Sequence, residues 1–144
     1  MAYSVLEREL ASDAGAWARE HLVTDVVAWL TTIAPDGTPQ SSPIWFMWDD
    51  ATIFFYSQPD KPKLTNIAAS SRVSFSLRSD HYADHWLIIE GHAAIDPSIP
   101  PADVHRRFKA KYAEPLAHSG MDEVEAARDY SVPIRITPTR VRVA

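Results

Sequence analysis

The chain of 144 residues contains no cysteine. This absence excludes disulfides, thiolate nucleophiles, zinc–thiolate centres and iron–sulfur clusters. Glycine is also scarce: the four glycines lie far apart, so the sequence has neither a P-loop nor a glycine-rich Rossmann loop. No apolar run approaches the roughly 18–20 residues that cross a membrane, and the N-terminal segment is too charged for a secretory signal. We therefore expect a cytoplasmic protein that does not associate with membranes.

Basic residues are outnumbered by acidic ones. Lys and Arg number 14 against 19 Asp and Glu, which gives a net charge of −5 and argues against a nucleic-acid binder. Residues 51–78 are an exception, with four basic side chains and one acid. This local excess favours a small phosphorylated ligand, while a basic face exposed to solvent is the alternative. The length suits one domain, residues 1–144.

Apolar periodicity predicts about six short strands with helices between them. We expect strands at 26–33, 38–48, 51–57, 72–77, 85–95 and 132–143, and helices at 4–20, within 58–69, at 102–112 and at 122–128. Asp36-Gly37 between the first two strands is a strong hairpin signal. Pro138 places the last strand at a sheet edge or bends it. Mostly antiparallel strands of this length indicate a mainly β fold with helices, a barrel or a sandwich.

The junction between the third predicted strand and the following helix combines groups that bind phosphate. Ser57 and Gln58 end the strand, and Lys61 and Lys63 lie in or near the first helical turn, for which Asp60 is the expected N-cap. Cations, hydroxyls and the free amides of a helix N-terminus are the usual phosphate donors. Two lysines there oppose the helix dipole unless an anion is near. A bound phosphate is therefore expected, with solvated lysines as the alternative.

The second predicted strand is rich in aromatic residues and interrupted by proline. Pro43 cannot donate to a ladder, which leaves neighbouring backbone groups free to meet a ligand. Trp45 and Trp48 point to opposite faces of a regular strand, so one can flank a planar ring while the other fills the core. A strand buried on both faces at a dimer contact is the alternative.

Seven short segments occur in a characteristic order: Trp29-Leu30-Thr31-Thr32, Pro35-Asp36-Gly37-Thr38-Pro39, Ser42-Pro43-Ile44-Trp45-Phe46, Tyr56-Ser57-Gln58, Lys63-Leu64-Thr65-Asn66-Ile67, Arg72-Val73-Ser74 and the stretch 134–141. This ordered set resembles the pyridoxamine-phosphate-oxidase-like flavin and deazaflavin oxidoreductases, and within them the branch that uses coenzyme F420. The resemblance implies a six-stranded antiparallel split β-barrel of the FMN-binding type. It also implies a homodimer with the cofactor at the subunit interface.

The same resemblance implies a set of cofactor-binding residues. Those along the cofactor ring are Ser42, Pro43, Ile44 and Trp45, and those at the phosphate and ribityl chain are Ser57, Gln58, Lys61, Lys63 and Asn66. The basic strand motif and paired downstream arginines of the oxidase itself are missing from this sequence. Pyridoxamine oxidation is therefore not the expected reaction.

The implied function is an F420-dependent oxidoreductase that transfers a hydride between the deazaflavin and an unsaturated small-molecule substrate. An FMN-dependent oxidoreductase of the same fold and a non-catalytic binder of flavin or haem are the alternatives. No catalytic residue can be assigned, although Tyr82 and His85 are candidate proton donors, with simple surface placement as the alternative. The six histidines lack metal-ligand spacing, so no metal site is expected.

Overall fold

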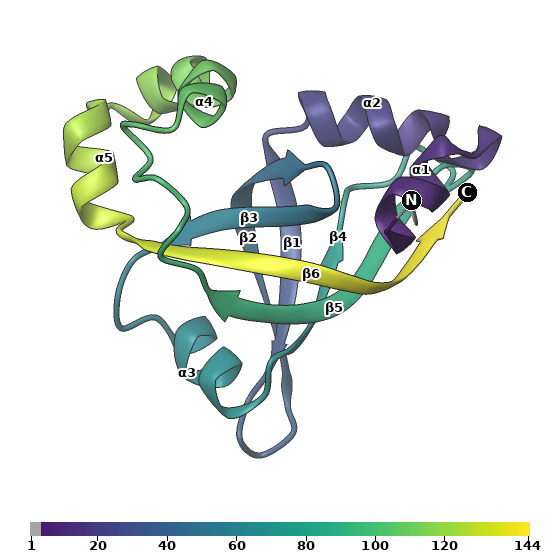
Figure 1. The fold of residues 1–144 in the computed structure, drawn as a ribbon, viewed down its shortest axis with the longest axis horizontal. Helices are drawn as coiled ribbons and strands as arrows, with labels where there is room; N and C mark the ends of the chain where they lie inside the picture. The colour runs from purple at the N-terminus through teal and green to yellow at the C-terminus, as the bar shows by residue number, and fades with distance from the viewer. Residues whose placement is uncertain (1–3) are drawn as a thin grey trace.

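Six β-strands form the centre of the molecule in a computed structural model that describes residues 4–144. They are β1 (Val27–Ile33), β2 (Pro39–Asp49), β3 (Thr52–Ser57), β4 (Arg72–Ser76), β5 (Leu87–Ile95) and β6 (Val132–Val143). Every neighbouring pair is antiparallel, and the sheet closes into a barrel in the order β1-β2-β3-β6-β5-β4 (Figure 1). The predicted α+β fold built on a six-stranded antiparallel split β-barrel is confirmed.

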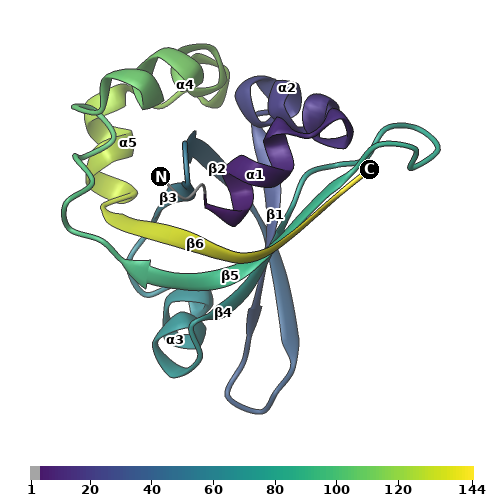
Figure 2. The same ribbon diagram turned by 45° about the vertical axis from the view of Figure 1, so that its right-hand side comes forward.

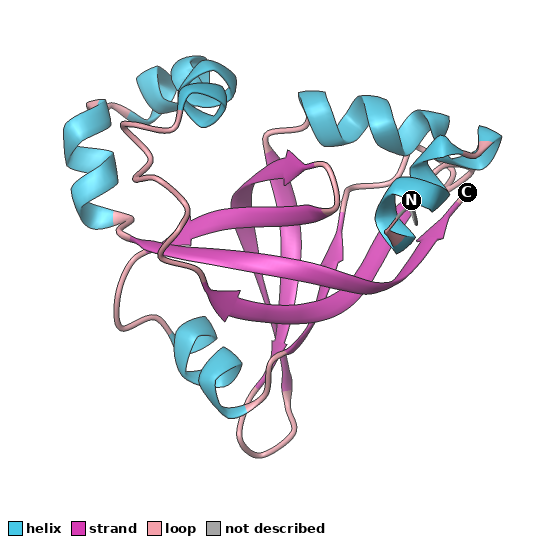
Figure 3. Cartoon of the chain, in the orientation of Figure 1, coloured by secondary structure: helices cyan, strands magenta, loops and turns pink. Residues whose placement is uncertain are grey.

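Helices lie on the outside of the barrel (Figure 3). They are α1 (Val5–Ala11), α2 (Ala16–Thr24), α3 (Pro62–Ala69), α4 (Arg106–Ser119) and α5 (Glu123–Asp129), with a 3₁₀ turn, η1 (Asp13–Gly15), between the first two. α1 packs on β6, and α3 packs on β1 and β5. α4 and α5 belong to the connection from β5 to β6 and stand at one side of the barrel (Figure 2). Within residues 4–144, no helix combines the length and apolar character needed to span a membrane.

The main hydrophobic core fills the barrel with side chains from alternate strand positions. Its largest fully buried members include Leu30, Phe46, Phe55, Phe75, Ile89 and Ile134. Leu6 and Leu10 of α1 join the same core. Removing one such side chain from water stabilises the fold by about 1.5–3 kcal/mol. The alternation that predicted the strands therefore arises from the barrel interior.

A second, smaller core lies on the outer face of β2 and β3. Met47, Phe54 and Tyr56 cluster there with Ile99, which belongs to the segment between β5 and α4. Phe108 of α4 packs against this cluster. Both faces of β2 and β3 therefore pack against apolar side chains, and the contact of Phe108 with the outer cluster attaches α4 to the barrel.

The predicted helix at 4–20 is interrupted, because the chain turns at residues 12–15. Gly15 packs against the backbone of α1, and a Cβ at this position would lie 2.7 Å from the Leu10 Cα. The Ser12 hydroxyl accepts a hydrogen bond from the Gly15 N–H at 3.2 Å and caps η1. The apolar spacing continues through the break, so periodicity alone could not locate it.

The predicted N-cap of α3 is wrong. Pro62 occupies the first turn as expected, but Lys61 is the N-cap residue and no side chain caps the helix. Asp60 instead adopts a left-handed backbone conformation with φ of 64°. Aspartate is one of the few residue types that tolerate this region, so its place in the sequence reflects the turn that redirects the chain.

The predicted edge position of Pro138 is also wrong, since β6 pairs with β3 on one side and β5 on the other. The alternative, a bend, agrees with the structure. The register shifts so that Gly91 faces Pro138 whereas Glu90 faces Arg140, which leaves Thr139 as an extra residue. Such a β-bulge accommodates a proline without an edge and increases the local bend of the strand.

The connection from β5 to β6 differs from the prediction mainly in its first helix. α4 begins at Arg106, four residues later than expected, because His105 Nδ1 accepts the Phe108 N–H at 3.2 Å and caps it. The helix continues past Pro115 and ends at Gly120, which has a left-handed φ of 80°. α5 (Glu123–Asp129) begins and ends one residue later than the predicted helix at 122–128.

Candidate functional site

A cavity of about 940 Å³ lies between the barrel and the helix pair α4–α5. Its barrel wall comes from Val27 of β1, from β2, from the end of β3 and from the start of α3, and its other wall comes from the two helices. Sites for small molecules and cofactors occupy about 300–1,000 Å³. The cavity is therefore large enough for an organic cofactor and is the candidate site.

Two lysines and two polar residues form the basic part of this cavity. Ser57 ends β3, Gln58 follows it, Lys61 precedes α3 and Lys63 lies in its first turn. Burial lowers the pKa of Lys63, and the neighbouring Lys61 lowers it further. Within residues 4–144 neither lysine takes part in a salt bridge. Because two such cations repel each other and oppose the helix dipole, a phosphate bound between them would relieve an existing electrostatic strain.

Aromatic rings form another part of the cavity. Trp45 of β2 stacks on Tyr112 of α4, with ring centroids 4.9 Å apart and an interplanar angle of 12°. Phe108 stacks on Tyr112 in turn, at 4.7 Å and 30°. Pro43 and Ile44 line the cavity next to Trp45 along the strand. The arrangement offers flat apolar surfaces that suit a ring-shaped ligand.

The Tyr112 hydroxyl fastens α4 to the barrel. β1 and β2 pair as far as Val27 opposite Trp45 and separate beyond that point. Tyr112 occupies the opening: its oxygen accepts the Phe46 N–H at 2.7 Å and can donate to the carbonyl of Phe46 at 2.7 Å or of Val26 at 2.8 Å. Burial raises the pKa of Tyr112 well above its usual value. The hydroxyl therefore takes the place of the missing backbone partner of β2.

Lys111, the residue before Tyr112, reinforces the same attachment. Its Nζ donates to the carbonyls of Leu22 and Phe46, both at 3.2 Å, and lies 3.8 Å from the centroid of the Phe46 ring. Burial lowers the pKa of Lys111 to about 8. Lys111 does not line the cavity, so we assign it a structural role.

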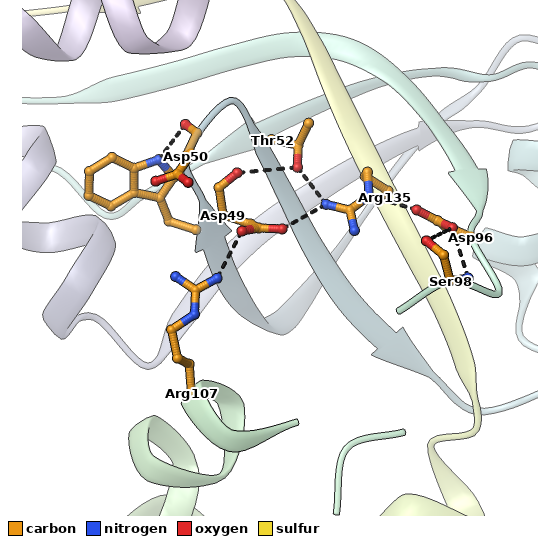
Figure 4. Close-up of polar contacts among 8 residues, drawn as sticks. Asp49, Asp50, Thr52, Asp96, Ser98, Arg107 and Arg135 are labelled. Atoms are coloured by element: carbon orange, nitrogen blue, oxygen red, sulfur yellow. Dashed lines mark hydrogen bonds and ion pairs between the residues drawn. The ribbon is translucent and has the colours of Figure 1, made fainter. Parts of the chain in front are cut away.

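A polar network outside the cavity holds the start of α4 (Figure 4). Arg135 of β6 donates to Asp96 at 2.7 Å, to Asp49 at 3.0 Å and to the Thr52 hydroxyl at 2.7 Å. Arg107 of α4 donates to the second carboxylate oxygen of Asp49 at 2.8 Å. One side chain at the end of β2 therefore connects α4 with β6.

The carboxylates of this network are held in their charged form. The Arg135 hydrogen bond, followed by that of Ser98, lowers the pKa of Asp96 to about 2. Burial raises the pKa of Asp49, but its hydrogen bonds with Arg135 and Arg107 outweigh burial and leave it below the ordinary 3.8. Because the carboxylates stay ionised at neutral pH, the network serves as a fixed support for the cavity wall.

Seven of the nine predicted cofactor-binding residues come together at the cavity: Pro43, Ile44, Trp45, Ser57, Gln58, Lys61 and Lys63. Ser42 and Asn66 do not line it. Asn66 is buried, and its Nδ2 donates to Thr32 Oγ1 at 3.0 Å and to Gln40 Oε1 at 2.7 Å. The structure thus gives Asn66 a role in joining α3 to β1 and β2.

The candidate proton donors lie elsewhere. Tyr82 is 82% exposed in the loop before β5, and the His85 Nδ1 lies 3.3 Å from the carbonyl oxygen of Ala144. Neither residue lines the cavity. The wall made by α4 was not predicted, although Phe108, Tyr112 and Leu116 follow one another at i, i+4 and i+8. That spacing marks one helical face but does not say what the face contacts.

Fold and site together define a class: a small split β-barrel with a cavity that has a basic part and an aromatic part. Residues 16–144 match the family described as pyridoxamine 5'-phosphate oxidase, and the chain belongs to this family. The family resemblance expected from the ordered motifs is confirmed. No curated protein matches the sequence.

Several solved structures share the fold. An F420 reductase is 25% identical, with a TM-score of 0.67 over 86% of this chain and 94% of its own. An FAD-binding protein of Mesorhizobium loti is 20% identical, with a TM-score of 0.61 over 90% of this chain and 94% of its own. HutZ, the haem storage protein of Vibrio cholerae, is 14% identical, with a TM-score of 0.68 over 92% and 95%. The last two proteins resemble this chain in fold alone.

Proposed function

We propose that this protein is an oxidoreductase that binds coenzyme F420 in the cavity and reduces an unsaturated small molecule. The observation that carries the proposal is the pair Lys61 and Lys63, which line the same cavity as the aromatic rings of Trp45 and Tyr112. A phosphorylated ligand with a planar ring satisfies both parts at once. The 25% identity to an F420 reductase supports the choice of deazaflavin.

In this proposal the chain binds and orients the cofactor, and the deazaflavin, once bound, supplies the hydride chemistry. Lys61, Lys63 and the polar groups of Ser57 and Gln58 hold the phosphate. Pro43 does not interrupt the pairing of β2 with β1, contrary to the expectation from the sequence. Backbone groups of residues 43–45 meet the ring edge on the other side of β2, because β3 pairs with β2 only from Phe46 to Asp49. The rings on α4 exclude water from the opposite side.

We also propose that the protein is a homodimer, with a second copy covering the outer face of β1. Val27 and Trp29 are 39% and 48% exposed on that face. Val27 also lines the cavity, so the exposed apolar face is continuous with the site. A partner there would bury the tryptophan and complete the site. Light scattering tests this: we expect a dimer for the wild-type protein and a monomer for Trp29→Glu, whereas a monomeric wild type refutes the proposal.

Two other functions fit the same fold. FMN carries a phosphate and a planar ring as F420 does, so an FMN-dependent oxidoreductase is the first alternative. A non-catalytic flavin or haem binder is the second, and the fold similarity to a haem storage protein favours including it. The absorption spectrum of the bound chromophore distinguishes the three ligands.

The decisive experiment titrates the apo protein with F420, FMN and haem side by side. We expect F420 to bind most tightly, and Lys63→Ala to weaken its binding by about 1.5–3 kcal/mol, the range for a hydrogen bond to a charged group. Arg78→Ala is the matched control, since Arg78 is an exposed cation that does not line the cavity. Tighter binding of FMN or haem would replace the proposal with the corresponding alternative.

A further inference from the structure

The wall that α4 and α5 contribute to the cavity is almost entirely apolar. Its side chains include Ala110, Ala113, Leu116, Ala117, Met121 and Ala126. The charged side chains of this wall pair with each other, and its remaining polar groups are the hydroxyls of Ser119 and Tyr130. Lys109 and Glu123 form a salt bridge at 3.5 Å, and the Ser119 hydroxyl donates to the Leu116 carbonyl at 2.6 Å.

This apolar wall is not covered by the described part of the chain. Tyr112 is the only residue of α4 that is buried, while Ala113 and Ala117, on the cavity side, are exposed. A helix face of this kind is normally packed against a core. Here it faces open space across from the basic and aromatic groups of the barrel.

We propose that the α4–α5 wall binds the substrate, and that this substrate is an uncharged, largely apolar molecule containing a ring. The inference rests on the proposed function, because the cofactor is taken to occupy the lysines. An anionic substrate group placed against this wall would lose its hydration, and the one cation that the described residues place on the wall, Lys109, already pairs with Glu123. An apolar ring gains contact with the alanines and with the exposed edges of the aromatic stack.

The lining of the cavity of about 940 Å³ divides between a barrel side, which carries the two lysines, and the helical wall. A cofactor held at residues 57–63 and 43–45 then leaves the helical wall to a second molecule. The polarity of the wall, rather than a catalytic group, selects that molecule.

The test uses N-phenyl-1-naphthylamine, an uncharged ring compound that fluoresces in apolar surroundings, titrated into the full chain without cofactor. Three α5 variants are compared: Ala126→Asp, Ala126→Val and Ala127→Asp. Ala127 is adjacent to Ala126 and equally part-buried but does not line the cavity. Ala117→Asp on α4 repeats the test if Ala126→Asp fails to fold. Circular dichroism and light scattering confirm that each variant keeps the fold and oligomeric state of the wild type.

We expect Ala126→Asp to weaken probe binding at least about tenfold, since a buried carboxylate must be desolvated beside the ring. Ala126→Val and Ala127→Asp should remain close to the wild type. Equal losses for Asp and Val at position 126 would overturn the proposal, because space and not polarity would then decide binding. Unchanged binding in Ala126→Asp would overturn it as well. Failure of F420 and FMN to bind is a separate result that refutes the proposed function and is read from the cofactor titration alone.

Discussion

The attachment of α4 through the Tyr112 hydroxyl leads to a quantitative prediction for Tyr112→Phe. The change removes one oxygen and keeps the ring that stacks on Trp45 and Phe108. The Phe46 N–H loses its partner at 2.7 Å, and the Val26 carbonyl loses its donor at 2.8 Å. The Phe46 carbonyl keeps a hydrogen bond from Lys111. One buried donor is therefore left unsatisfied.

Leaving a buried polar group without a partner costs about 1–3 kcal/mol. We therefore expect Tyr112→Phe to lower the free energy of unfolding by that amount in urea denaturation, with an unchanged m-value because the fold stays the same. The midpoint of the urea transition should fall accordingly.

Tyr82→Phe is the control, because Tyr82 is 82% exposed and exposed substitutions typically change stability by less than about 0.5 kcal/mol. If Tyr112→Phe also stays within that range, the hydroxyl does not replace the backbone partner of β2, and α4 must be held by its apolar contacts.

Three further variants test other parts of the structure. Arg135→Met should lower the free energy of unfolding at neutral pH. The loss should shrink as the pH falls from 3.8 towards about 2, because the Asp96 carboxyl, whose pKa is lowered by Arg135, stabilises the fold only while it is ionised. Urea denaturation across this range measures the loss, and a loss that does not change with pH would contradict the prediction. Lys111 has a lowered pKa, so the unfolded chain holds a proton that the folded chain releases between about pH 8 and 10.5. The stability of the wild type relative to Lys111→Met should therefore rise with pH over this interval, and a flat or falling difference would show that Lys111 is not desolvated. Gly15→Ala should destabilise the protein by about 1–3 kcal/mol in thermal or urea unfolding, because a Cβ would overlap the α1 backbone; an effect near zero would mean that α1 can shift at no cost.

Local patterns were sufficient to predict the six strands, and the family resemblance then implied the barrel. The strands were found because their interior residues alternate, and the Asp36-Gly37 step marked the first hairpin, where Gly37 has a φ of 89°. The basic junction was also predictable, since Ser57, Gln58, Lys61 and Lys63 lie within seven consecutive residues. Residues this close in the sequence lie near one another in any fold.

Long-range contacts were not predictable from one sequence. The Tyr112 hydroxyl meets a backbone group 66 residues away, and nothing in its helical spacing distinguishes it from an ordinary apolar position. Gly15 breaks the first helix because of what packs against it, and Pro138 fits inside the sheet because a bulge opposite Gly91 accepts it. In each case the determining partner is distant in the chain.

In the proposed function, residues 57–63 hold the phosphate of the cofactor. The most direct measurement is a titration of wild type and Lys63→Ala with F420 and with the deazaflavin that carries the ribityl chain but lacks the phosphate. We predict that the wild type binds F420 more tightly than the phosphate-free deazaflavin and that Lys63→Ala narrows this difference in binding free energy by about 1.5–3 kcal/mol, while binding of the phosphate-free deazaflavin changes little. Equal affinities for the two ligands in the wild type, or the same difference in both proteins, would place the phosphate away from Lys63 and refute the proposed phosphate site.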